Sequence, residues 1–127
     1  MLLCPTGRFE ISNCDLFGTL PTELFALPSL VVLDVSSNGL NGTIPEQVGR
    51  LNASARELDL SNNQLTGPIP TGFGSLTAMT KLFLHGNPGL TGNMSAIVCA
   101  KNGSTVSNLS YVSVPPSVVC DCCDLVL

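Results

Sequence analysis

The amino-acid sequence predicts an α/β solenoid: a right-handed superhelix with a parallel β-sheet on its concave face and 3-10 or extended turns on its convex face. The first observation is internal repetition, because one pattern recurs every 24 or 25 residues, in segments 9–21, 33–45, 58–70 and 82–94. The second is the regular placement of leucines within each copy. A fixed period of about 20 to 29 residues is typical of stacked repeats, and four copies exceed the roughly three that a stable stack requires.

A short strand is expected at the start of each copy. In Leu58-Asp-Leu60 apolar and polar side chains alternate, which is the pattern of a half-buried strand. The leucines should point into the solenoid, and the residues between them should face outward. Strands that include residues 33–35, 58–60 and 82–84 then align in one parallel sheet. The copies are therefore interpreted as leucine-rich repeats, each stabilised by its neighbours.

One asparagine follows each of three strands, at Asn38, Asn63 and Asn87. An amide at this position can bond backbone groups of the turn that the strand ladder leaves unpaired. Cys14 takes the same position in the first copy. We expect it to be a buried thiol, because cysteine fits a small buried site, rather than a reactive one.

A glycine and a proline close the motif. Gly42 and Gly67 permit backbone conformations that other residues rarely adopt. Pro45 and Pro70 fix φ and disfavour continuation into a long helix. The outer side of the solenoid should therefore hold turns, extended segments and short 3-10 pieces.

The motif Leu-x-Leu-Ser-x-Asn-x-Leu-x-Gly-x-Ile-Pro resembles the plant-type subclass of leucine-rich repeats. Residues 58–70 match it at every position, and residues 33–45 match it with Val35 in place of Leu. The resemblance covers about residues 9–98. Proteins of this subclass include receptor-kinase ectodomains and inhibitors of pathogen polygalacturonases, so the resemblance implies a recognition function.

The tail around Cys120-Asp-Cys122-Cys123 is similar to the cysteine-rich C-terminal caps of secreted or cell-surface leucine-rich-repeat proteins of microalgae. We therefore expect leucine-rich repeats over residues 1–98, about four of them starting mid-solenoid, and a cysteine-rich cap over residues 99–127. Leu2 and Leu3 stand where a preceding repeat would end. This predicts the C-terminal part of a longer protein, or a gene model missing its beginning, with core residues exposed at that end.

Six cysteines and several glycosylation sequons favour an extracellular or cell-surface location, because such cysteine density suits an oxidising compartment. A repeat rich in Ser, Thr and Asn can also produce sequons by chance. The sequons are Asn41, Asn52, Asn93, Asn102 and Asn108.

The cap cysteines could form disulfides or bind zinc. Together with Cys99, the cluster of Cys120, Cys122 and Cys123 offers four thiolates. Neighbouring Cys122 and Cys123 do not easily reach one metal, and zinc thiolates are usually spaced by two to four residues. We expect a disulfide between Cys99 and one member of the cluster, tying the tail to the last repeat, and no metal or other cofactor.

Composition argues against several other functions. Lys and Arg total five without a cluster, the net charge is −4, and there is one Tyr and no Trp, which disfavours a nucleic-acid partner. No apolar stretch approaches the roughly 20 residues of a membrane span. His85 lies near Ser and Asp residues, but these recur because the repeat recurs, and no nucleophile elbow is present. We therefore expect a protein that is not an enzyme and has no catalytic residues.

The outward residues of the strands form the candidate ligand-binding face. Asp34 and Asp59 follow the general repeat pattern, whereas Arg8, Glu10, Lys81, Phe83 and His85 depart from it. An outward Phe83 can anchor a ligand, or it can be buried by the C-terminal tail. The candidates are Lys81, Phe83, His85, Asp59, Asp34, Glu10 and Arg8.

A rigid sheet that displays many side chains suits recognition of a protein, peptide or glycan. The sequence therefore predicts a recognition module, part of an extracellular or cell-surface receptor-like protein. Two alternatives stay open: an inhibitor of extracellular hydrolases of the polygalacturonase-inhibitor type, and a structural protein of the wall or matrix.

Overall fold

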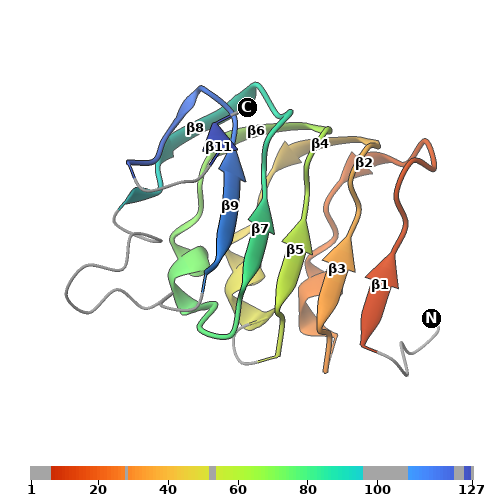
Figure 1. Ribbon diagram of the computed structural model, residues 1–127. Helices are drawn as coiled ribbons and strands as arrows, with labels where there is room; N and C mark the ends of the chain where they lie inside the picture. Colours follow the sequence, from red (N-terminus) through yellow and green to blue (C-terminus); the bar gives the residue numbers. More distant parts are fainter. Residues whose placement is uncertain (1–6, 28, 52–53, 96–108, 122–124, 127) are drawn as a thin grey trace.

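The computed structural model describes residues 7–27, 29–51, 54–95, 109–121 and 125–126. They form a right-handed solenoid whose first sheet is fully parallel, with strand order β1-β3-β5-β7-β9-β11 (Figure 1). The predicted strands at residues 33–35, 58–60 and 82–84 correspond to three strands of this sheet. Its members are β1 (Arg8–Glu10), β3 (Val32–Asp34), β5 (Glu57–Asp59), β7 (Lys81–Phe83), β9 (Tyr111–Val114) and β11 (Leu125–Val126).

A second parallel sheet follows the turns after these strands, in the order β10-β8-β6-β4-β2. The sequence predicted extended segments here. Each coil places its extended segment beside that of the preceding coil, so that the segments pair as parallel strands. In two of these strands Gly42 and Gly67 have φ of +75° and +82°, and a Cβ on either would lie 2.9 Å from a threonine methyl of the preceding repeat. The strands are β2 (Phe17–Thr19), β4 (Gly39–Thr43), β6 (Gln64–Pro68), β8 (Gly89–Asn93) and β10 (Val118–Val119).

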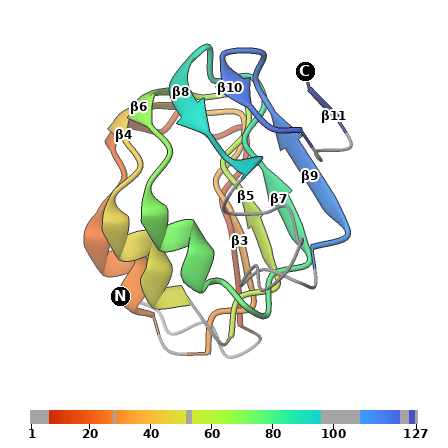
Figure 2. The same ribbon diagram turned by 90° about the vertical axis from the view of Figure 1, so that its left-hand side faces the viewer.

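A short 3-10 helix forms the third side of each of the first three coils, after the strands of the two sheets. Thr22–Ala26, Glu46–Leu51 and Thr71–Ser75 form η1, η2 and η3, which lie on the side of the solenoid opposite the first sheet (Figure 2). Pro21 and Pro70 precede η1 and η3 in extended backbone conformation. The predicted short 3-10 pieces are thereby confirmed.

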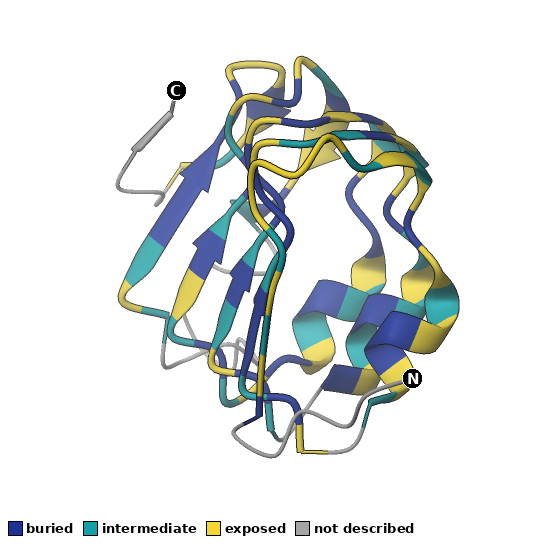
Figure 3. Cartoon of the chain, turned by 90° about the vertical axis from the view of Figure 1, so that its right-hand side faces the viewer, coloured by how far each residue is buried: buried dark blue, intermediate teal, exposed yellow. Residues whose placement is uncertain are grey.

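The core fills the space between the two sheets and the helices (Figure 3). Leu60, Leu84 and Val114 point inward from successive coils and are fully buried, as are Phe25 and Phe73 from the 3-10 helices. Burying a leucine-sized side chain contributes about 1.5–3 kcal/mol, so this continuous apolar column holds the repeats together.

Asparagines stitch each coil to the preceding one, as the sequence predicted. Asn63 is buried; its Nδ2 donates to the carbonyl oxygens of Val35 and Leu60, and its Oδ1 accepts from the Leu40 N–H. Asn87 bonds the coil before it in the same way. These bonds satisfy backbone groups in a turn that no strand partner reaches.

The expected burial of Cys14 is wrong. Asn38 reaches back to the N–H groups of Cys14 and Leu16, so the backbone of this coil is bonded like the others. No described strand lies beyond β1 to cover the Cys14 side chain, however. The thiol is free and exposed, and its Sγ lies 3.2 Å from the Ser12 carbonyl oxygen.

The coil at β1 is less well packed than the coils that follow. Phe9, Ile11 and Leu16 are only partly buried, whereas their equivalents Leu58, Leu60 and Leu65 are fully buried. The partly buried side chains line an apolar hollow of about 240 Å³. Leu2 and Leu3, expected to be exposed at this end, lie outside the described residues.

The C-terminal tail adds a further coil. Strand β9 pairs with β7, β11 pairs with β9, and β10 joins the second sheet beside β8. The division predicted between residues 98 and 99 falls in segment 96–108, outside the described residues, and stays a prediction. No helix among the residues described is both long and apolar enough to cross a membrane.

Candidate ligand-binding face

The outward side of the first sheet, called the concave face below, presents two columns of side chains. Strand register aligns Glu10, Asp34, Asp59, Phe83 and Ser113 in one column. It aligns Arg8, Val32, Glu57, Lys81 and Tyr111 in the other. All seven predicted binding residues therefore lie on or next to this sheet, and His85 is two residues beyond the end of β7.

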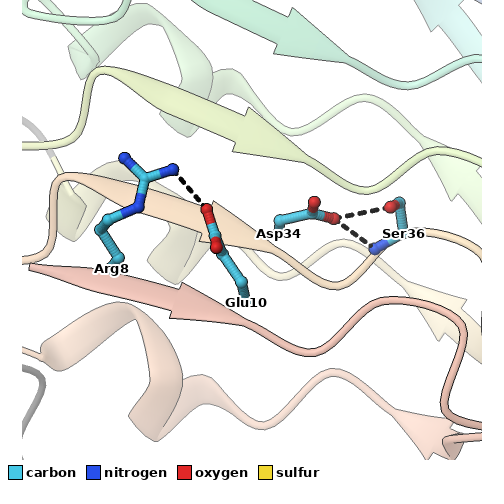
Figure 4. Close-up of polar contacts among 4 residues, drawn as sticks. All are labelled: Arg8, Glu10, Asp34 and Ser36. Carbon is cyan, nitrogen blue, oxygen red and sulfur yellow. Dashed lines mark hydrogen bonds and ion pairs between the residues drawn. The ribbon is translucent and has the colours of Figure 1, made fainter.

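Asp34 and Asp59 each use one carboxylate oxygen to fix the turn that follows the strand. Asp34 Oδ1 accepts from the Ser36 N–H at 2.9 Å and from the Ser36 hydroxyl at 2.6 Å (Figure 4). Asp59 Oδ1 accepts from Ser61 at 3.0 and 2.6 Å. These bonds explain why Asp and Ser recur, and they hold both carboxylates in a defined orientation on the face.

Arg8 and Glu10 form an ion pair on β1 (Figure 4). Their side chains are 54% and 45% exposed, so the pair contributes little to stability. Its consequence is local neutralisation, because the guanidinium offsets the Glu10 carboxylate at this edge of the sheet.

Aromatic side chains replace the Asp-Ser pattern at the C-terminal end of the face. The rings of Phe83 and Tyr111 lie 5.0 Å apart at an interplanar angle of 42°. Phe83 also meets His85 edge-on, with ring centroids 6.4 Å apart. Phe83 and Tyr111 are both partly buried, so this pair forms an apolar patch that solvent or a ligand can reach.

The sequence left open that the C-terminal tail folds over Phe83 and buries it. In the structure the tail contacts Phe83 but leaves it only partly buried. Strand β9 lies beside β7 in the same sheet, and its Tyr111 packs against Phe83 from the side. Tyr111 was not among the residues identified from the sequence. The signal available was the alternation in Tyr111-Val-Ser-Val114, which marks another strand with an outward Tyr.

His85 stands where the preceding coils carry Ser36 and Ser61. Its Nδ1 lies 2.6 Å from the hydroxyl of Ser113, which is fully buried on β9. The imidazole is thereby held against the aromatic pair. Lys81 is exposed on β7, between Glu57 on one side and Tyr111 on the other.

The predicted glycosylation sites that the structure describes lie away from the concave face. Asn41 and Asn93 are exposed on β4 and β8 of the second sheet, and Asn93 accepts from the Ser95 N–H at 2.8 Å. The remaining sequons at 52, 102 and 108 lie outside the described residues. Occupancy of all five stays a prediction.

Cys120 is disulfide-bonded in the structure. Cys99, Cys122 and Cys123 lie outside the described residues, so the pairing of Cys99 with the cluster remains a prediction. Cys120 itself packs against the core as a partly buried residue.

A leucine rich repeat family model matches residues 28–88. A probable leucine-rich repeat receptor-like serine/threonine-protein kinase of Arabidopsis thaliana is 42% identical over 48 residues, which are 38% of this chain and 5% of that protein. The solved structure of the plant peptide hormone receptor RGFR1 in complex with RGF2 has a TM-score of 0.74 at 29% identity, covering 87% of this chain and 16% of that one.

The Arabidopsis receptor kinase HAESA, in complex with the peptide hormone IDA and the co-receptor SERK1, has a TM-score of 0.66 at 28% identity, over 83% of this chain and 17% of that one. The two-sheet coils and the repeat motif thus define a leucine-rich-repeat fold. In sequence, the chain is similar to a plant receptor-like kinase and a receptor-like protein of Arabidopsis thaliana. It spans about 5% of the length of the curated relatives that it matches.

Proposed function

We propose that this chain is a non-enzymatic recognition module of a receptor-like protein, which binds a peptide or protein ligand through the concave face. The observation that supports this most directly is the Phe83–Tyr111 pair. The repeat pattern places Asp at the Phe83 position, so an aromatic there is not required by the fold. Aromatic residues in accessible patches are frequent anchors of binding interfaces.

The comparisons support the same class of ligand. Two of the similar structures are receptors bound to RGF2 and to the peptide hormone IDA. The relatives are receptor-like proteins, which supports a place for this chain at the cell surface or outside the cell. The hydrolase-inhibitor alternative also uses a protein ligand, so it agrees with this proposal on the class of ligand. A purely structural role would give the accessible aromatic pair no ligand to contact.

Selection of displayed peptides tests this proposal. A random peptide library is panned on the full chain, and the affinities of recovered peptides are measured by titration calorimetry for three proteins: the unmodified chain, Phe83→Ser and Phe17→Ser. Phe17 is 87% exposed on β2 of the second sheet, which makes it a matched control.

Loss of an anchor residue that contributes about 2 kcal/mol weakens binding roughly 30-fold. The peptide affinity of Phe83→Ser should therefore fall by at least roughly 30-fold, whereas that of Phe17→Ser should change little. Circular dichroism confirms that both variants stay folded at the assay temperature. The proposal is wrong if the selected peptides bind Phe83→Ser as tightly as the unmodified chain, or if panning recovers no specific peptide.

A further inference from the structure

We infer that the ligand is a peptide in the polyproline II conformation that crosses the strands of the concave face, with a cationic residue and an apolar or aromatic residue three positions apart. This inference rests on the proposed function and specifies the chemistry of its ligand. Two features of the face support it. Carboxylates and aromatic rings occupy different strands, and the distance between these two places matches the repeat of one peptide conformation.

The aromatic patch receives the apolar residue. Phe83 and Tyr111 come from neighbouring strands β7 and β9; both are partly buried, and their rings lie 5.0 Å apart, tilted by 42°. His85 packs edge-on against Phe83, and its bond to Ser113 fixes the ring. Apolar side chains and proline rings bind such fixed aromatic surfaces, which is the usual basis of polyproline recognition.

The carboxylates beside this patch complement a cation. Asp34 and Asp59 occupy adjacent rungs on β3 and β5, and each is oriented by a serine through one oxygen only. The second oxygen of each accepts no hydrogen bond within the described residues. Glu57 adds a third carboxylate on the same face of β5.

Other charges on the face fix where the cation can lie. Glu10 is already neutralised by Arg8, so β1 offers no net charge. Lys81 is exposed on β7 and disfavours a second cation near the aromatic patch. The favourable position for a cationic side chain is therefore above β3 and β5, next to Asp34 and Asp59.

Spacing then selects the peptide conformation. Neighbouring strands lie about 4.8 Å apart, so the midpoint of β3 and β5 is two spacings, about 9.6 Å, from the midpoint of β7 and β9. A polyproline II helix rises about 3.1 Å per residue with three residues per turn, which puts residues i and i+3 on one side about 9.3 Å apart. A β-strand instead puts same-side residues about 6.8 or 13.6 Å apart.

Designed peptides test this inference. Each contains one Arg and one Leu in a proline-rich background, separated by two, three or four positions and in both orders, and is labelled for fluorescence polarisation with the full chain. The peptide with a separation of three positions in one of the two orders should bind roughly tenfold more tightly than the other spacings. Replacement of its Arg by norleucine should remove most of that preference.

Two protein variants identify the contacts. The double variant Asp34→Asn with Asp59→Asn keeps the oxygen that accepts from serine but removes both charges, and should abolish the preference for Arg over norleucine. Glu23→Gln is the control, since its exposed carboxylate lies on η1, on the side of the solenoid opposite the first sheet, and should leave the preference intact.

The outcomes separate this inference from the proposed function. If binding does not depend on spacing, or the double Asn variant retains the preference for Arg, the inference is overturned, while loss of library-selected peptides in Phe83→Ser still supports recognition by the concave face. If none of the designed peptides binds at about 1 mM, the inference is overturned too. Tight binding at three positions with the expected losses supports it.

Discussion

Asn63→Ala should destabilise the solenoid by about 1.5–4.5 kcal/mol, because one buried amide joins two coils. Asn63 Nδ2 donates to the carbonyl oxygens of Val35, Leu60 and Ser61, each at 3.1 Å, and its Oδ1 accepts from Leu40. All three carbonyls keep a second donor, from Asn38, Asn87 and Ser37 respectively.

The magnitude therefore depends mainly on the Leu40 N–H, which loses the Asn63 oxygen. An unsatisfied buried donor costs about 1–3 kcal/mol, and the loss of the weaker shared bonds adds about 0.5–1.5 kcal/mol. The sum is a large fraction of the roughly 5–15 kcal/mol by which a domain is stable.

Urea unfolding followed by circular dichroism measures this change. The midpoint should fall while the m-value stays constant, since the surface exposed on unfolding is unchanged. Gln64→Ala, at an exposed neighbouring position on β6, is the control and should shift stability by less than about 0.5 kcal/mol. A loss below about 1 kcal/mol for Asn63→Ala would refute the idea that the amide is needed to satisfy buried backbone groups.

Two further substitutions and one mapping experiment test the fold. Leu60→Asp should prevent folding, because Leu60 is fully buried and an unpaired buried charge costs several kcal/mol; a soluble variant that unfolds cooperatively would contradict the core. Gly67→Ala should cost about 1–2 kcal/mol by thermal unfolding, since φ is +82° and the added Cβ meets a Thr43 methyl at 2.9 Å; an unchanged midpoint would argue against this geometry. Non-reducing peptide mapping should link Cys99 to the 120–123 cluster, and a free Cys99 would exclude that staple.

Local patterns predicted the first sheet, the 3-10 pieces and the asparagine bonds. Each of these depends on interactions that every repeat makes in the same way, so alternation in Leu58-Asp-Leu60 and the position of Asn63 are sufficient. The second sheet was predicted only as extended segments. Its strands contain Gly, Asn and Pro, residues that are depleted in strands, and their pairing arises from stacking between coils.

Two residues show where sequence patterns were insufficient. Cys14 was expected to be buried because cysteine fits a small buried site. Its equivalents Asn63 and Asn87 are indeed buried, yet burial at this position needs a covering coil, and no described strand lies beyond β1. Tyr111 was missed because its coil lacks the leucine motif, with Val112 and Val114 as the inward residues. Only strand register placed it next to Lys81 and against Phe83.

The most direct test of recognition by the concave face is a chemical-shift titration of the ¹⁵N-labelled full chain with a library-selected peptide. If the aromatic patch is the binding site, backbone amides of β7 and β9 and of His85 should shift together and saturate at a common affinity. The amides of β2 and β4 in the second sheet, including Phe17, should not shift. Saturable shifts confined to the second sheet would contradict binding at Phe83 and Tyr111.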